Sequence, residues 1–282
     1  MNTPERKLAV LTGASSGIGL ELARICASQN YDLVIAADDT RINEAARELE
    51  ERGIQCSAVR CDLSVRAGID SLMKAVEGMR NRPVDALFAN AGQDAGRAFL
   101  DHGIDAALRA VHMDICGTLS LVHGVGQLMR ERHQGRILIT GSMGGRIPGS
   151  FQAVYKGSMA FLESFSVALS DELKDSGVTV TCLMPGAAET NFFQRAGMDA
   201  TDVGTSEKTD AADVARIGFD AMMKGDLKVV AGFANKMRAA MTNILPDGTL
   251  ADSHRGTAEP KTAKKWAWGS DSKQRRQHFS GS

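Results

Sequence analysis

The residues Gly13-Ala14-Ser15-Ser16-Gly17-Ile18-Gly19 come directly after an apolar run, Leu8–Thr12, and open a helix-like stretch. Glycine permits a tight turn and a close approach of the backbone to a ligand, and the first turn of a helix offers free N–H groups. This combination, at a junction between a strand and a helix, is typical of a pyrophosphate site. The stretch therefore predicts a dinucleotide-binding unit at the start of the chain.

Short apolar runs alternate with longer amphipathic stretches along the rest of the sequence. Seven runs are predicted as strands, at residues 8–12, 33–36, 57–60, 84–88, 136–140, 178–183 and 228–231. Several are apolar at consecutive positions, as expected for strands that are covered on both faces. Helical spacing marks residues 18–28 and 43–52. The alternation predicts an α/β fold, a single doubly wound domain whose parallel sheet has helices on both faces.

Charge divides the 282 residues into two unlike parts, although the formal net charge is −1. Residues 253–282 contain seven Lys and Arg but two Asp and Glu, a net charge of +5, so residues 1–252 carry −6. The first part has ordinary globular composition and no linker, and we predict one domain there. The second part is polar and basic, and we predict a disordered tail. Its basic and aromatic stretch 264–268 leaves binding to RNA, a membrane surface or a partner as the alternative.

Several classes of protein are disfavoured. The longest apolar runs are shorter than the roughly 18–20 residues that span a bilayer, and the first residues lack the apolar segment of a signal peptide, so we expect a cytoplasmic protein. The five cysteines have no CxxC spacing, and the histidines have no metal-ligand spacing, which argues against disulfides and metal. An acidic body disfavours nucleic acid as the main ligand.

Five short motifs occur in an order that resembles the short-chain dehydrogenase/reductase family. The stretch Thr12–Gly19 resembles its signature, and Ser142 precedes Tyr155 by the thirteen residues that separate its catalytic Ser and Tyr. The resemblance implies a seven-stranded Rossmann-type sheet, a nicotinamide cofactor, a carbonyl or secondary alcohol substrate, and a homodimer or homotetramer. The remaining motifs resemble its Asn-Ala-Gly segment, its adenine-contacting pair and its nicotinamide-gripping segment: Asn90-Ala91-Gly92, Asp62-Leu63, and Pro185-Gly186 with Thr190.

The carboxylate of Asp38 favours NAD over NADP. It lies 19 residues beyond Gly19, where a carboxylate accepts hydrogen bonds from a ribose 2′-OH and repels a 2′-phosphate. Arg41 could still pair with a phosphate, which keeps NADP as an alternative. For Asp39 we favour a local role at the start of the next helix. The resemblance implies this cofactor-binding set: Gly13, Ser15, Ser16, Gly17, Ile18, Gly19, Asp38, Asp62, Leu63, Asn90, Ala91, Gly92, Pro185, Gly186 and Thr190.

The catalytic motif departs from the family pattern at two positions. Ser142 and Tyr155 are present, but Met159 stands where the family has a Lys four residues after the Tyr, and Asp114 stands where it has an Asn. Lys156 is no simple substitute, because position i+1 points about 100° around the helix from Tyr155. Without a nearby ammonium a Tyr keeps a pKa near 10, so about one molecule in a thousand is ionised at pH 7. We therefore expect either a slow reductase or a chain that has abandoned hydride transfer.

Three functions stay open. The leading one is an NAD(P)-dependent oxidoreductase that interconverts a carbonyl and a secondary alcohol, with Tyr155 as acid or base and Ser142 polarising the oxygen. The second is a catalytically impaired binding or regulatory protein, and the third is a lyase or isomerase that uses the Tyr and Ser without redox chemistry. We expect residues 190–210 to form a lid and residues 233–245 a docked helix. Phe151, Gln152, Phe192 and Phe193 are expected to line the substrate pocket.

Overall fold

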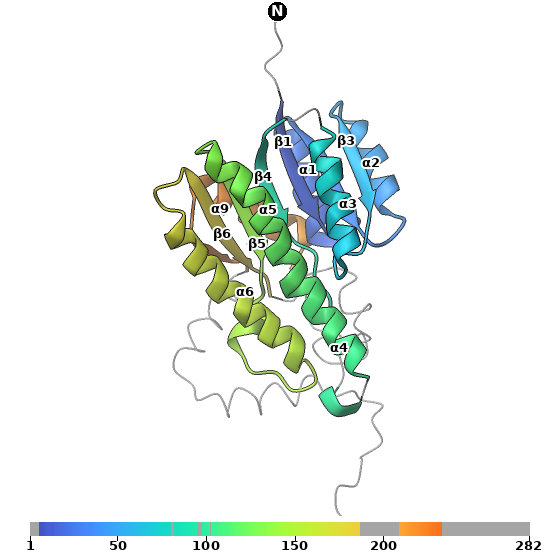
Figure 1. Ribbon diagram of the computed structural model, residues 1–282, viewed down its shortest axis with the longest axis vertical. Helices are drawn as coiled ribbons and strands as arrows, with labels where there is room; N and C mark the ends of the chain where they lie inside the picture. The colour runs from blue at the N-terminus through green and yellow to red at the C-terminus, as the bar shows by residue number, and fades with distance from the viewer. Residues whose placement is uncertain (1–5, 80–81, 95–97, 102, 187–208, 233–282) are drawn as a thin grey trace, which may run out of the picture.

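The computed structural model describes residues 6–79, 82–94, 98–101, 103–186 and 209–232. Their core is one parallel sheet in the strand order β3-β2-β1-β4-β5-β6-β7, as Figure 1 shows. The strands are β1 (Lys7–Thr12), β2 (Tyr31–Ala37), β3 (Cys56–Arg60), β4 (Val84–Ala89), β5 (Gly135–Thr140), β6 (Val178–Met184) and β7 (Lys228–Val230). All seven predicted strands are present, and the predicted Rossmann-type doubly wound fold is confirmed.

Helices cover both faces of this sheet (Figure 1). On one face lie α1 (Gly17–Ser28), α2 (Ile42–Glu50) and α9 (Ala211–Lys224). On the other lie α3 (Arg66–Glu77), α5 (Thr118–Glu131) and α6 (Ala153–Glu172), with α4 (Ile104–Val111) continuing the line of α5. Shorter helical turns are η1 (Phe99–Asp101), η3 (Met143–Arg146) and η2 (His112–Gly117), a π-helical turn that joins α4 to α5.

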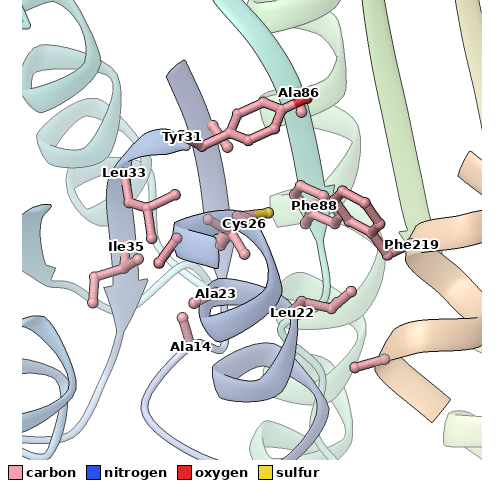
Figure 2. Packing of buried hydrophobic residues seen from close by; sticks show 14 of the residues in the cluster. Ala14, Leu22, Ala23, Cys26, Tyr31, Leu33, Ile35, Ala86, Phe88 and Phe219 are labelled. Atoms are coloured by element: carbon pink, nitrogen blue, oxygen red, sulfur yellow. The ribbon is translucent and has the colours of Figure 1, made fainter. Parts of the chain in front are cut away.

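The strands are apolar at successive positions because each face of the sheet has its own core. In β1, Ala9 and Leu11 pack against the helices of the first face, whereas Leu8 and Val10 pack against those of the second. Figure 2 shows the first core, where the side chains of α1 and α9 meet β2 and β4. The rings of Phe88 and Phe219 stack there with their centroids 6.4 Å apart. This packing fixes α1, and with it the glycine turn, against the sheet.

The strand order places a topological switch between β1 and β4, since the chain leaves β1 toward β2 and returns to pair β4 on its other side. Ligands of open α/β sheets bind at such a point, beyond the carboxyl ends of the strands. None of the helices in the described part of the chain is long and apolar enough to cross a membrane. The predicted docked helix at 233–245, the tail at 253–282, and residues 190–208 of the predicted lid lie outside the described residues.

Candidate active site

The glycine turn between β1 and α1 is built so that the amino end of α1 faces the switch point. Gly13 and Gly17 have positive φ angles of 66° and 55°, which side chains disfavour. A Cβ on Gly19 would lie 2.2 Å from the Gly13 carbonyl oxygen, so the helix packs on the turn only with glycine there. Within the described structure α1 has no side-chain cap and no acidic residue in its first turn. Its first N–H groups are therefore suited to an anion.

Thr12 joins this turn to the Asn-Ala-Gly motif that follows β4. Its hydroxyl accepts hydrogen bonds from the backbone N–H groups of Asn90 at 2.9 Å and Ala91 at 3.0 Å. The side-chain oxygen of Asn90 accepts a hydrogen bond from Thr140, at the end of β5, at 3.0 Å. These bonds tie the carboxyl ends of three adjacent strands together, so the two glycine-containing motifs hold one fixed arrangement.

Asp38 and Asp39 follow β2 at the same edge of the sheet, and Asp39 is held by neighbouring side chains. The Asp39 carboxylate accepts hydrogen bonds from Ser15 Oγ at 2.8 Å and from the Arg41 guanidinium at 2.9 Å. Chiefly because of Arg41, the pKa of Asp39 falls to about 2. Arg41 is thus held by Asp39, which also accepts its backbone N–H at the start of α2. The local role expected of Asp39 agrees with these contacts.

Asp62 and Leu63 follow β3. Burial raises the pKa of the Asp62 carboxyl, but hydrogen bonds from Ser64 and Arg109 lower it by more. The net pKa is therefore below its ordinary value. Arg109 of α4 lies 2.8 Å from Asp62 Oδ2, and Leu63 is buried. The Asp62 side chain therefore links the end of β3 to α4, and its contact with an adenine ring stays a prediction.

Ser142 and Tyr155, thirteen residues apart in the sequence, meet beyond the end of β5. Ser142 begins η3, where its Oγ accepts the N–H of Gly144 at 3.0 Å, and its side chain is hydrogen-bonded to Tyr155 in the first turn of α6. Packing enforces this meeting, because a Cβ on Gly145 would lie 2.6 Å from the backbone nitrogen of Ala160 in α6. The two hydroxyls are therefore placed to share one oxygen atom of a substrate.

The segment after β6 approaches the same turn. The Pro185 carbonyl accepts the backbone N–H of Met143 at 2.9 Å. Gly186 is the last described residue of this segment, and Thr190, predicted to grip the nicotinamide, lies outside the described residues. The structure thus brings the start of the predicted nicotinamide segment next to Ser142, and the roles of Pro185, Gly186 and Thr190 stay predictions.

Asp114 lies in the π-helical turn η2, a type of distortion that is frequent at functional sites. It has no exposed surface, its Oδ1 accepts the backbone N–H of Gln93 at 2.7 Å, and its Oδ2 is buried with no hydrogen-bond partner among the described residues. Burial raises the pKa of Asp114 well above its ordinary value. The protonated side chain presents a carbonyl acceptor and one O–H donor, where the amide of an Asn presents a carbonyl acceptor and two N–H donors.

Met159 is part of the apolar core and not of a polar site. Its exposure is 3%, and it belongs to the core cluster against which Tyr155 packs. Burial raises the pKa of the Tyr155 hydroxyl, the hydrogen bond with Ser142 lowers it, and the nearby carboxyls Asp114 and Asp94 raise it. The net effect is a raised pKa for Tyr155. Tyr155 is therefore held in its protonated form at neutral pH.

Two polar residues beside this centre were not among the predicted catalytic or cofactor-binding residues. Asp94 and Lys156 are almost completely buried, together with Gln152, which was predicted to line the pocket. The Gln152 amide donates a hydrogen bond to Asp94 Oδ2, and Lys156 is attracted to the Asp94 carboxylate. Asp94 stands two residues after the Asn-Ala-Gly motif. A charged residue so close to the end of a buried strand was the signal that could have identified it.

The fold and the site together define a Rossmann-type protein with a Ser–Tyr pair beyond β5. Comparison with known proteins agrees: a sequence profile described as short chain dehydrogenase matches residues 7–201. The chain belongs to the short-chain dehydrogenase/reductase family of NAD(P)-dependent oxidoreductases.

Known relatives cover most of the described domain. An uncharacterised oxidoreductase of Staphylococcus epidermidis is 29% identical over 212 residues, 75% of this chain and 88% of that protein. The very-long-chain 3-oxoacyl-CoA reductase of Neurospora crassa is 36% identical over 61% of this chain and 53% of its own length. A short-chain dehydrogenase of Burkholderia phymatum, solved with NAD, has a TM-score of 0.77 and 23% identity, over 86% of this chain and 94% of its own. One from Sphingobium yanoikuyae, solved with NADPH, has a TM-score of 0.74 and 24% identity, over 88% and 99%.

Proposed function

We propose that this protein is an oxidoreductase that reduces a carbonyl group to a secondary alcohol, with NAD(H) as the preferred cofactor. The observation that carries the proposal is the hydrogen-bonded pair of Ser142 and Tyr155, which lies beyond the carboxyl end of β5 at the edge of the sheet where α1 begins. The pair lies at the edge of the sheet where the glycine turn and the Asn-Ala-Gly motif also meet. This arrangement supports a Ser–Tyr pair that binds the substrate oxygen at the same edge of the sheet as the dinucleotide site.

The residues of the nucleotide site fit a dinucleotide. The turn at Gly13–Gly19 and the first N–H groups of α1 would hold the pyrophosphate, and Asp38, directly after β2, would hold the ribose hydroxyls. Arg41 is engaged by Asp39, which supports NAD over NADP because a 2′-phosphate would have to compete for that guanidinium. A bound nicotinamide supplies the hydride.

The chain's own residues do the rest. Ser142 and Tyr155 donate hydrogen bonds to the carbonyl oxygen of the substrate and so orient its carbonyl carbon toward the nicotinamide. As negative charge develops on that oxygen, Tyr155 donates its proton to it. Carbonyl reduction uses the protonated Tyr, which is the form that burial and the two carboxyls favour here. The protonated Asp114 can stand in for the Asn of the family pattern, since both side chains offer a carbonyl acceptor and at least one donor.

The proposal is tested by titrating the full chain with NADH and NADPH in a calorimeter, and by following NADH absorbance in a single turnover against a panel of aldehydes and ketones. We expect tighter binding of NADH and slow oxidation of it, which Tyr155→Phe should abolish without weakening cofactor binding. Equal rates in Tyr155→Phe would refute the assignment of the acid.

A second candidate function rests on the burial of Met159, which leaves an apolar thioether where the family has an ammonium. In that case the chain binds a dinucleotide but does not transfer hydride, and it acts as a binding protein. Tight NADH binding with no NADH oxidation across the carbonyl panel would favour this function over the first.

A further inference from the structure

Three polar side chains are buried together beside Ser142 and Tyr155: Asp94, Gln152 and Lys156, which we call the Lys156 cluster. Their exposures are 5%, 5% and 7%. Asp94 comes from the segment after β4, and the other two come from the start of α6. Charged side chains are rarely buried to this extent unless they are paired or serve a ligand.

Two glycines make room for the Lys156 side chain. A Cβ on Gly149 would lie 2.2 Å from Lys156 Cδ and 2.4 Å from its Cε, so the lysine stem occupies the space where another residue would place its side chain. A Cβ on Gly144 would lie 3.7 Å from Lys156 Cε and 3.1 Å from Ser142 Oγ. The Lys156 Cε and the Ser142 Oγ are thus no more than 6.8 Å apart, since they lie at those distances from one point. The end of the Lys156 side chain therefore lies close to the hydroxyl of the Ser–Tyr pair.

The loop that leads into α6 has a strained backbone where it holds this arrangement. Phe151 has a φ of +64°, a conformation that is rare for a bulky side chain. It directly precedes Gln152, whose amide donates to Asp94 and whose carbonyl accepts the N–H of Lys156 at 2.9 Å. Strain of this kind persists where surrounding contacts enforce it, and such sites are frequently functional.

Among the residues that the structure describes, the cluster contains less negative charge than a buried ammonium requires. Burial lowers the pKa of Lys156 to about 8, and the attraction to Asp94 opposes this without cancelling it. An ammonium has three N–H donors, and the Asp94 carboxylate already accepts the Gln152 amide. A second carboxylate beside Lys156 would therefore be stabilised by it and would raise its pKa in turn.

We propose that the Lys156 cluster is a substrate-recognition subsite, in which the Lys156 ammonium binds a carboxylate that lies one or two carbons from the reacting carbonyl. The short separation from Ser142 supports this spacing, because one small oxo acid can contact both groups. The inference rests on the proposed function in that it assigns the substrate class of the same Ser–Tyr pair. It makes Lys156 a specificity-determining residue, and Gln152 and Asp94 its positioning residues.

The test compares the binding of 2-oxobutanoate and 3-oxobutanoate with that of their methyl esters to the full chain, with and without NAD, by calorimetry at pH 8. We expect the acids to bind about 10- to 100-fold more tightly than the esters, which is the effect of one hydrogen bond to a charged group. Binding of the acids should also take up protons, seen as a dependence of the heat on the ionisation enthalpy of the buffer, because Lys156 is partly deprotonated before binding.

Variants separate recognition from a structural role. Lys156→Met should remove the preference for the acid and the proton uptake, whereas Lys156→Arg should keep the preference. Gly149→Ala keeps the charge but displaces the stem, and should also weaken the preference. Besides Asp94 of the cluster itself, the groups facing Lys156 include the buried carboxyl of Asp114 and the hydroxyl of Tyr155. Asp114→Asn should therefore leave the proton uptake unchanged, which assigns the proton to Lys156.

Equal affinity for acid and ester, including no measurable binding of either, overturns the subsite, as does an equal loss of both in a folded Lys156→Met. These results are distinguishable from failure of the proposed function. A preference for the acid without any NADH oxidation would support the subsite and contradict the oxidoreductase. NADH oxidation with neutral ketones but no preference for the acid would do the reverse.

Discussion

Replacing Met159 by Lys tests whether the missing ammonium limits this enzyme. The substitution Met159→Lys places a charge four residues after Tyr155, on the same face of α6. Met159 is 3% exposed and sits in an apolar cluster, so the new ammonium must be buried. We expect a gain in catalysis together with a loss of stability.

The size of each effect, on the pKa of Tyr155 and on stability, follows from the surroundings of Met159. A cation within about 4–6 Å lowers the pKa of a neighbouring acid by about 1–3 units, each worth about 1.36 kcal/mol. The present pKa of Tyr155 is raised by burial and by Asp114 and Asp94, so the ammonium acts on a group that is strongly held in its protonated form. Burial of an incompletely paired charge should cost about 2–4 kcal/mol of unfolding free energy. The gain in catalysis is therefore measurable only if the variant remains folded after this loss of unfolding free energy.

The assay is the pH profile of NADH-linked carbonyl reduction, with urea unfolding measured alongside. In the unaltered protein the rate should stay flat into the alkaline range, because Tyr155 remains protonated. In Met159→Lys the decline should begin at a pH about 1–3 units lower, and turnover should rise about tenfold or more as the cofactor ribose gains a fixed partner. Met159→Leu is the matched control, with the same burial and no charge. A folded Met159→Lys that binds NADH but shows neither change would refute the reasoning.

Three further predictions concern single residues. The folded-state pKa of Lys156, about 8, is below its ordinary 10.5, so at this residue the native state binds fewer protons between these values, and its own contribution to stability should rise by about 3 kcal/mol from pH 8 to pH 10.5. This contribution is measured by urea unfolding as the pH-dependent difference between the unaltered protein and Lys156→Met, because cysteines whose pKa values are raised by burial lower stability over the same range in both. Asp38→Ala should weaken NADH binding about tenfold and NADPH binding less, measured by calorimetry, and an unchanged ratio would contradict its role. Asp114→Asn should change turnover by less than about threefold, because the protonated acid and the amide both offer a carbonyl acceptor and a donor; a large loss would show that Asp114 acts as a carboxylate.

The fold was predictable because its signals are local. Continuous apolar runs report strands buried on both faces, and the turn at Gly13–Gly19 requires glycine for reasons of backbone conformation and packing that hold within a few residues. The sequence also predicts the meeting of Ser142 and Tyr155, through the spacing of the family motif. These inferences need no knowledge of what lies across the sheet.

The Lys156 cluster was not predictable in this way because it depends on contacts between distant segments. The argument from helix geometry correctly places Lys156 away from the face of Met159, but it does not show what lies on the other side. On that side the turn around Gly149 packs on the Lys156 side chain, and Asp94, from the segment after β4, lies near its ammonium. The pairing of Arg41 with Asp39 was likewise not foreseen, since the sequence left the guanidinium available for a phosphate.

The two departures from the family pattern are compatible with each other. An ammonium near Tyr155 would stabilise the ionised forms of both Tyr155 and a buried carboxyl at position 114. With Met159 in its place, burial holds both groups protonated. Protonated Asp114 presents a carbonyl acceptor and an O–H donor where Asn presents a carbonyl acceptor and an NH₂ donor, so an acid at this position can make comparable contacts. An apolar side chain at position 159 is thus compatible with the raised pKa values of Tyr155 and Asp114, which burial causes, and Lys156 is a cation attracted to the buried Asp94 carboxylate.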